Sequence, residues 1–274
     1  GVIVQFGGQT PLRIANKLKE YGYKILGTSF EAIDISEDRE RFQKLIQKVG
    51  LKQPKSDISL GTKELVTKSS KLKFPILLRP SYVLGGRMME KMANLDDVQD
   101  YIDQNYWALE NNVILIDEFL QNAKEVDVDV LRDNQGNTMI AGIMEHIEEA
   151  GIHSGDSACS IPPFSLNDKI ISDIKKFSIS LVNELKILGL MNIQYAIKDD
   201  EIFILEANPR ASRTIPFLAK AIGIPFIKIA AELIVGKTLT EEYQNFDNST
   251  LPYFAIKEAV FPFNKFPNTD VILG

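Results

Sequence analysis

The stretch Glu-Ala-Asn-Pro-Arg-Ala-Ser-Arg at residues 206–213 decides our interpretation of this chain. It follows the apolar run Ile-Phe-Ile-Leu at residues 202–205, which predicts a buried strand. Alternate side chains of a strand share a face, so Glu206 and Asn208 are expected to point the same way. Pro209 has no N–H to donate and therefore ends the strand.

The chemistry of this stretch indicates a metal ion and an anion. A carboxylate and an amide oxygen on one face are hard ligands suited to Mg²⁺. Arg210 and Arg213 follow within one turn's length, and guanidinium groups suit phosphoryl oxygens. Phosphoryl transfer from a magnesium nucleotide requires this combination. The structural alternative is a buried glutamate–arginine pair at a sheet edge.

Composition bounds the class of protein. The 274 residues, 45% hydrophobic and 25% charged, suit a globular protein with one large core or two modest ones. A net charge of −6, with no basic block, argues against nucleic acid as the main partner. No apolar run approaches the roughly 20 residues of a membrane span. The single Cys159 excludes an internal disulfide and fits a reducing compartment, so we expect a cytoplasmic protein.

The N-terminal residues predict a βαβ unit followed by a helix. The expected elements are strands at residues 2–6 and 24–26 and helices at residues 11–21 and 36–49. Thr10 is the expected N-cap of the first helix, with Pro11 at its first position. The Gly-Gly turn before it can hold an anion. Arg39 and Arg41, in the first turn of the second helix, are either solvated side chains or phosphate contacts.

The middle of the chain predicts strands that alternate with helices. Strands are expected at residues 55–60, 74–80, 88–91, 113–120, 126–131, 138–147, 191–197, 201–208 and 253–262. Helices are expected at residues 62–71, 96–105, 166–188, 217–221 and 225–235. The glycine pair Gly85-Gly86 lies between two strands, where its backbone can close over a ligand or form a plain hairpin. Residues 237–250 are polar and predict a linker.

Gln194 can share a metal with Glu206 only if both face one side of the sheet. A regular two-residue turn at Asp199-Asp200 puts Gln194 on the opposite face. We therefore predict either a three-residue loop that includes Glu201 or a bulge within this hairpin.

The loop at residues 150–160 is rich in glycine and serine and contains His153, one of only two histidines. Such loops carry binding groups on a scaffold. A Ser-His-Asp triad fails because no strand–turn–helix elbow surrounds any serine of this loop. Cys159 is interpreted as a small buried residue and His146, within a strand, as structural.

Taken together, these motifs resemble the ATP-grasp fold, and specifically the large subunit of carbamoyl phosphate synthase. The resemblance is carried by residues 7–11, 37–42, 79–87, 153–157 and 206–210, in this order and spacing. That family contains two similar halves, of which the first phosphorylates bicarbonate and the second carbamate. Residues 81–87, 143–148, 157–159 and 263–267 resemble the second half.

The resemblance implies roles for individual residues. Arg39 and Arg79 contact ATP phosphates, under a loop that includes Gly85 and Gly86. The backbone from Glu118 to Leu120 meets adenine, Glu118 standing where the family often has a histidine, and Glu125 takes the ribose. Residues along the nucleotide are Gly151, Ile152, His153 and Ser154. Gln194, Glu206 and Asn208 bind metal, and Arg210 and Arg213, with Asn208, serve the acceptor and the transferring phosphoryl group.

The resemblance also implies a domain plan, a reaction and partners. Residues 1–36 are the tail of a Rossmann-like pre-ATP-grasp domain, residues 37–236 the ATP-grasp module with a smaller lobe at about 53–117, and residues 237–274 a linker and final strand. The reaction is ATP-dependent phosphorylation of carbamate, with two Mg²⁺ or Mn²⁺ ions; K⁺ is a further candidate. The partners are the other half of the large subunit and a small glutaminase subunit, in pyrimidine and arginine biosynthesis.

Three alternatives stay open at this point. They are the bicarbonate-phosphorylating half, another ATP-grasp ligase that joins a carboxylate to an amine, and an ATP-binding module that only assembles or regulates a complex.

Overall fold

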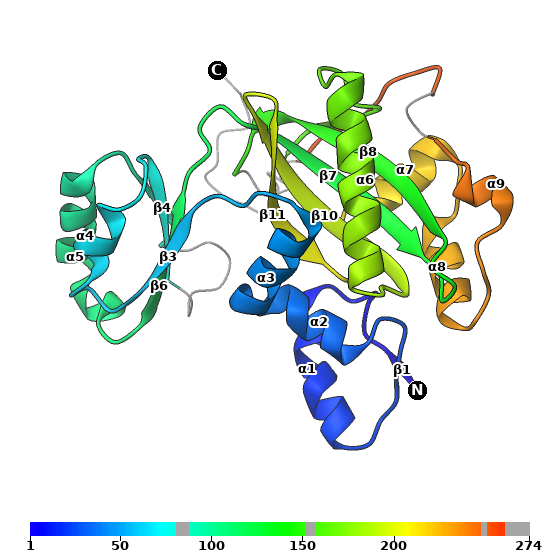
Figure 1. Cartoon of the computed structure of the whole chain (residues 1–274), viewed down its shortest axis with the longest axis horizontal. Helices are drawn as coiled ribbons and strands as arrows, with labels where there is room; N and C mark the ends of the chain where they lie inside the picture. Colours follow the sequence, from blue (N-terminus) through cyan, green and yellow to red (C-terminus); the bar gives the residue numbers. More distant parts are fainter. Residues whose placement is uncertain (81–87, 152–156, 248–250, 261–274) are drawn as a thin grey trace.

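The computed structural model describes residues 1–80, 88–151, 157–247 and 251–260. These residues form a mixed α/β structure, as the sequence predicts. Its sheets have two, four and six strands. In Figure 1 the four-stranded sheet and its helices form a smaller lobe at one side of the molecule. The six-stranded sheet forms the central lobe, and the N-terminal unit lies beneath it in that view.

The N-terminal unit is the expected βαβ arrangement. β1 (Val2–Ile3) and β2 (Ile25–Leu26) pair in parallel and are joined by α1 (Gln9–Glu20). The expectation of a Thr10 N-cap is wrong. The helix begins earlier, because Gly8 takes a φ of 70° and serves as the N-cap, which leaves Thr10 inside the first turn.

Two helices replace the single helix predicted from residue 36. α2 (Phe30–Glu37) ends where α3 (Arg39–Val49) begins. The boundary is Asp38, whose carboxylate accepts a hydrogen bond of 2.8 Å from the Arg41 backbone N–H. An aspartate in this position satisfies a free N–H at the helix start. Glu37 is therefore the last residue of α2 rather than part of the second helix.

The smaller lobe is an antiparallel sheet covered on one face. Its strand order is β3-β6-β4-β5, with β3 (Ser56–Leu60), β4 (Ile76–Pro80), β5 (Glu90–Met92) and β6 (Val113–Glu118). α4 (Leu65–Ser69) and α5 (Leu95–Leu109) pack on the face that carries Ile76, Leu78, Ile114 and Ile116. Because side chains alternate along a strand, Arg79 and Asp117 point from the opposite face.

The larger lobe is built on an antiparallel six-stranded sheet. Its order is β11-β10-β7-β8-β9-β12. The strands are β7 (Lys124–Arg132), β8 (Thr138–Glu149), β9 (Cys159–Ile161), β10 (Gly189–Lys198), β11 (Glu201–Asn208) and β12 (Ala255–Lys257). β11 ends directly before Pro209, as expected, whereas the last strand is shorter than the sequence predicts.

Helices cover both faces of this sheet. α6 (Asp168–Glu184) crosses one face in Figure 1 and packs with α3 against Val126, Val128 and Val130. α7 (Ile215–Ile222) and α8 (Phe226–Ile234) pack on the other face, against residues that include Leu131, Met144 and Leu190. The residues after Gly236, expected to be a linker, contain α9 (Glu241–Gln244), and their Leu239 is 4% exposed.

Candidate functional site

The hairpin of β10 and β11 sets the register of the site. Its turn has two residues, Asp199 and Asp200, with φ values of 51° and 60°. A bulge then interrupts the ladder, so that Gln194 pairs with Glu206 and Leu205 has no residue opposite it. The predicted bulge is thus confirmed, and it brings Gln194 and Glu206 to the same face.

Polar side chains continue from this pair across three strands. The two neighbouring rows are Glu206–Gln194–Asp127 and Asn208–Asn192–Asp129. Glu206 is exposed and Gln194 is half-buried, whereas Asn208 is buried. The three predicted metal ligands therefore present one carboxylate and two amides on one face, a donor set that fits Mg²⁺. No cluster of three His, Cys, Asp or Glu side chains that could hold a metal occurs among the described residues.

Asp129 holds the loop that follows β11 through hydrogen bonds. Its carboxylate accepts hydrogen bonds from the hydroxyls of Ser212 and Thr214, at 2.8 and 3.2 Å, and from Asn192 at 3.3 Å. Burial raises the pKa of Asp129 to about 7, with a further contribution from the negative charge of Asp127. The loop that carries Arg210 and Arg213 is therefore anchored to the sheet by a carboxylate.

Asp127 lies in the same strand and is equally buried. One of its oxygens lies 3.1 Å from Nε2 of His146, and both side chains are 1% exposed. Its other oxygen, Oδ1, is buried and has no hydrogen-bond partner among the described residues. His146 thus has the structural contact that the sequence predicts.

The two arginines of the loop differ in their surroundings. Arg213 is exposed, whereas Arg210 is partly buried. The Arg210 Nε–H donates to Oε1 of Gln9 at 2.9 Å, and its Nη1 donates to the Ala211 carbonyl at 3.2 Å. Burial lowers the pKa of Arg210, and the nearby Glu206 carboxylate opposes that shift. Arg210 therefore lies beside the proposed metal ligands.

Arg39 and Arg79 converge on Asp117, a residue that the sequence interpretation missed. Arg39 contacts one Asp117 oxygen at 2.7 Å, and Arg79 contacts the other through Nε and Nη2 at 2.9 and 2.6 Å. The Arg39 Nη1 atom is buried without a partner among the described residues. An unpaired guanidinium N–H is costly to bury, and a phosphate oxygen would satisfy it. Arg41 instead pairs with Glu31 and Asp34 of α2. Of the two predictions for Arg41, a surface side chain therefore fits better than a phosphate contact.

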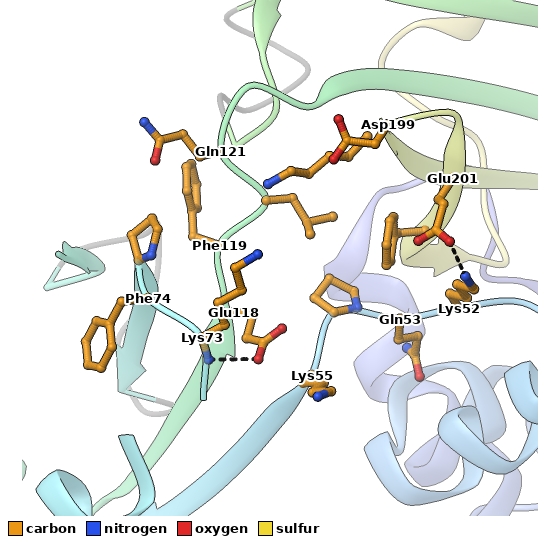
Figure 2. A pocket seen from close by; sticks show the side chains of 15 residues that line it. Lys52, Gln53, Lys55, Lys73, Phe74, Glu118, Phe119, Gln121, Asp199 and Glu201 are labelled. Carbon is orange, nitrogen blue, oxygen red and sulfur yellow. Dashed lines mark hydrogen bonds and ion pairs between the residues drawn. The ribbon is translucent and has the colours of Figure 1, made fainter. Parts of the chain in front are cut away.

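A cavity of about 590 Å³ lies where the two lobes meet. Its lining includes Glu118, Phe119 and Leu120, the residues expected to meet adenine. Figure 2 shows Glu118 beside Lys73, and its carboxylate accepts the Lys73 backbone N–H at 2.8 Å. Its side chain is therefore already engaged. The Leu120 N–H, in contrast, donates no hydrogen bond to another residue of the described chain, which suits the edge of a base.

Glu125 lies on the same face of β7 as Asp127 and is 4% exposed. It accepts a hydrogen bond of 3.0 Å from the Gly151 backbone N–H. Burial raises its pKa, although the bond from Gly151 opposes the shift. The structure thus joins two of the residues that the resemblance places along the nucleotide.

Five of the predicted nucleotide contacts lie outside the described residues. They are Gly85, Gly86, Ile152, His153 and Ser154. Cys159 is fully buried, and burial raises its pKa to about 11, so the thiol stays protonated at neutral pH and is a poor nucleophile. No helix in the described ranges is long and apolar enough to cross a membrane.

Comparison with known proteins identifies the family. The family described as "Carbamoyl-phosphate synthase L chain, ATP binding domain" matches residues 38–242. The chain belongs to this family. A carbamoyl phosphate synthase large chain of Archaeoglobus fulgidus is 51% identical over 274 residues, which are 100% of this chain and 25% of that protein. The Xanthomonas axonopodis protein of the same name is 48% identical over 280 residues, 100% of this chain and 26% of that protein. The chain thus spans about a quarter of the length of these relatives.

Solved structures show the same fold at low sequence identity. The biotin carboxylase–βγ-ATP complex of Campylobacter jejuni has a TM-score of 0.69 at 16% identity, covering 85% of this chain and 53% of that one. The biotin carboxylase domain of Hydrogenobacter thermophilus 2-oxoglutarate carboxylase, in complex with MgADP and bicarbonate, also has a TM-score of 0.69 at 16% identity, covering 89% and 55%. This chain therefore has the ATP-grasp fold.

Proposed function

We propose that this chain is the ATP-grasp module that phosphorylates carbamate with ATP and yields carbamoyl phosphate and ADP, as the second half of a carbamoyl phosphate synthase large subunit. The observation that carries the proposal is the shared face of Gln194, Glu206 and Asn208, beside Arg210. Membership of the family and identities near 50% to large chains support the assignment to an ATP-binding domain of the large chain. The motifs at residues 81–87 and 143–148 favour the second half.

In this proposal the cavity between the lobes receives adenine. The Leu120 N–H, which donates to no residue of the described ranges, and the backbone of Glu118 would face the base, and Glu125 the ribose. Arg39 and Arg79, held by Asp117, would offer their remaining guanidinium N–H groups to the phosphates. The Nη1 atom of Arg39, which has no partner in the part of the chain that the structure describes, supports this role.

Gln194, Glu206 and Asn208 would hold the magnesium. Bound Mg²⁺ supplies positive charge that neutralises the phosphate oxygens. Arg210 and Arg213 would hold the carbamate and orient it toward the terminal phosphate, so that two anions can approach. Asp129 fixes the loop that bears both arginines. No covalent protein nucleophile is needed, in agreement with the buried Cys159.

The reverse reaction tests the proposal, because carbamate is too short-lived for a simple forward assay. A full-length protein that contains this chain should make ATP from carbamoyl phosphate and MgADP. Arg210→Ala and Arg213→Ala should each lower ATP formation by about 10²-fold or more. Arg41→Ala is the matched control, since Arg41 pairs with α2, and should stay near wild type. If both loop substitutions spare ATP formation but abolish bicarbonate-stimulated ATP hydrolysis, the chain is the bicarbonate-phosphorylating half instead.

A further inference from the structure

The Arg210 guanidinium is held by residues from the opposite end of the chain. Oε1 of Gln9 accepts the Arg210 Nε–H at 2.9 Å, across 201 residues of sequence. The Gln9 amide then donates from Nε2 to Oε1 of Glu37 at 3.0 Å. The three side chains thus form a hydrogen-bonded chain from the end of α2, through the start of α1, to the loop after β11.

The hydrogen bonds that link Glu37, Gln9 and Arg210 have a defined direction. Glu37 offers a carboxylate, which accepts only, so the Gln9 amide must turn its N–H₂ group toward Glu37 and its oxygen toward Arg210. The Nη2 group of Arg210 has no hydrogen bond or ion pair within the described residues. The network therefore fixes one edge of the guanidinium and leaves another edge free for a ligand.

The backbone before α1 is shaped to deliver Gln9 to this position. Gly8 has a φ of 70°, which side-chain-bearing residues rarely adopt. A Cβ added at Gly7 would lie 2.4 Å from the Pro11 ring, so only glycine fits there. The Gly-Gly-Gln-Thr-Pro motif is thereby explained as a turn that aims the Gln9 side chain at Arg210.

A second contact ties the same two segments together. The Ala211 backbone N–H donates to the carbonyl of Gln5 at 2.9 Å, and Gln5 is fully buried. The Gln5 amide is in turn bonded to Thr28 and to the Leu190 carbonyl of β10. The N-terminal unit is therefore anchored both to the arginine loop and to the sheet beneath it, and can hold Arg210 in a constant place.

The Glu37 carboxylate also interacts with charges near the loop after β11. Burial raises the pKa of Glu37; the charges of Arg13 and Arg210 lower it, and those of Asp34 and Glu206 raise it. Glu37 is therefore linked to Arg210 by charge as well as through the Gln9 hydrogen bonds.

We propose that Gln9, supported by Glu37, is a positioning residue that orients the Arg210 guanidinium for the acceptor. The N-terminal unit then contributes to the acceptor site through Gln9. This rests on the proposed function, in which Arg210 holds the carbamoyl group.

The test compares Gln9→Met with wild type in the full-length protein. Methionine keeps the length of the side chain and removes both hydrogen bonds. We expect KM for carbamoyl phosphate in the reverse reaction to rise about 10-fold, the size of one hydrogen bond to a charged group, while KM for MgADP changes less than about twofold. If Gln9 had only a structural role, Gln9→Met would lower the unfolding temperature without raising KM for carbamoyl phosphate more than KM for MgADP.

A matched control and a rescue sharpen the result. Gln99→Met removes a similar bond from Gln99 to Asp103, 2.9 Å long and on the surface of α5, and should change neither KM. Glu37→Leu should act in the same direction as Gln9→Met. Glu37→Gln should stay within about twofold of wild type, because its amide oxygen still accepts from Gln9.

Crystal structures of the full-length wild type and Gln9→Met give a readout independent of turnover. We expect the Arg210 side chain to leave its wild-type orientation in the variant. An unchanged Arg210 together with an unchanged KM for carbamoyl phosphate overturns the inference. A wild-type protein that makes no ATP overturns the proposed function instead, and the orientation of Arg210 in the two structures still decides the positioning role.

Discussion

Glu206→Gln is the sharpest perturbation of the proposed metal site. The exchange keeps the shape of the side chain and one amide oxygen, and it removes the only carboxylate among the three proposed ligands. The Glu206 side chain is exposed and makes no hydrogen bond or ion pair with another residue of the described chain. Its charge acts on the partly buried Arg210 without a direct contact, so we expect the free energy of unfolding to change by less than about 1 kcal/mol.

The expected loss of activity is much larger than the loss of stability. Asp127 and Asp129 are buried, with His146 against one Asp127 oxygen and the Ser212 hydroxyl on Asp129, so we do not expect either to replace the missing charge. Removal of one preorganised electrostatic group lowers turnover by about 10² to 10³. We expect this reduction in ATP formation from carbamoyl phosphate and MgADP, measured in the full-length protein across a titration of Mg²⁺ and of Mn²⁺.

Glu232→Gln is the control on the surface of α8. Glu232 pairs with Lys237 at 3.0 Å, and both side chains are partly exposed. Such an ion pair contributes little, so turnover should stay within about twofold of wild type. Near-normal turnover of Glu206→Gln at saturating Mg²⁺ would refute our assignment of the ligand, as would an equal loss in both variants.

Two further predictions concern the remaining acidic groups. Asp117→Asn should raise KM for MgADP about 10-fold, because Arg39 and Arg79 lose the carboxylate that holds them near the phosphates; an unchanged KM for MgADP would show that the arginines need no such support. The pKa of Asp129 is raised to about 7 in the folded state, so folding favours its protonated form and stability should fall as pH rises from about 4 to 7. As pH rises across that window, the free energy of unfolding of Asp129→Asn should increase relative to that of wild type by up to about 4 kcal/mol, at about 1.4 kcal/mol per pH unit. Urea unfolding of both proteins at each pH measures this difference. A difference that stays constant with pH would contradict the prediction.

Much of the fold around the site follows from local patterns. The alternation of apolar side chains predicts β7, the apolar run at residues 202–205 predicts β11, and Pro209 predicts the end of β11. The need for Gln194 and Glu206 to share a face predicts either a three-residue loop or a bulge, and the structure contains the bulge. These features depend on neighbours within a few residues, where the period of the strand carries the information.

Contacts between distant segments could not be found in this way. Asp117 meets Arg39 across 78 residues and Gln9 meets Arg210 across 201. Each looks like an ordinary polar residue in its own segment, because the partner is supplied by the tertiary fold. The end of α2 was missed for a different reason. Ser36-Glu37-Asp38 contains several good capping residues, and only the carboxylate of Asp38 is aimed at the α3 backbone.

The way the smaller lobe is inserted has a consequence for protein engineering. Its first and last strands begin and end side by side: Ser56 pairs with Asp117, and the Glu118 N–H donates to the Lys55 carbonyl at 2.8 Å. The lobe therefore leaves and rejoins the rest of the chain at one point, and its core of Leu65, Leu78 and Ile114 is separate from the other cores. We expect that residues 56–117 could be exchanged as a cassette with those of a relative, and that such chimaeras would fold while differing in their grip on the nucleotide.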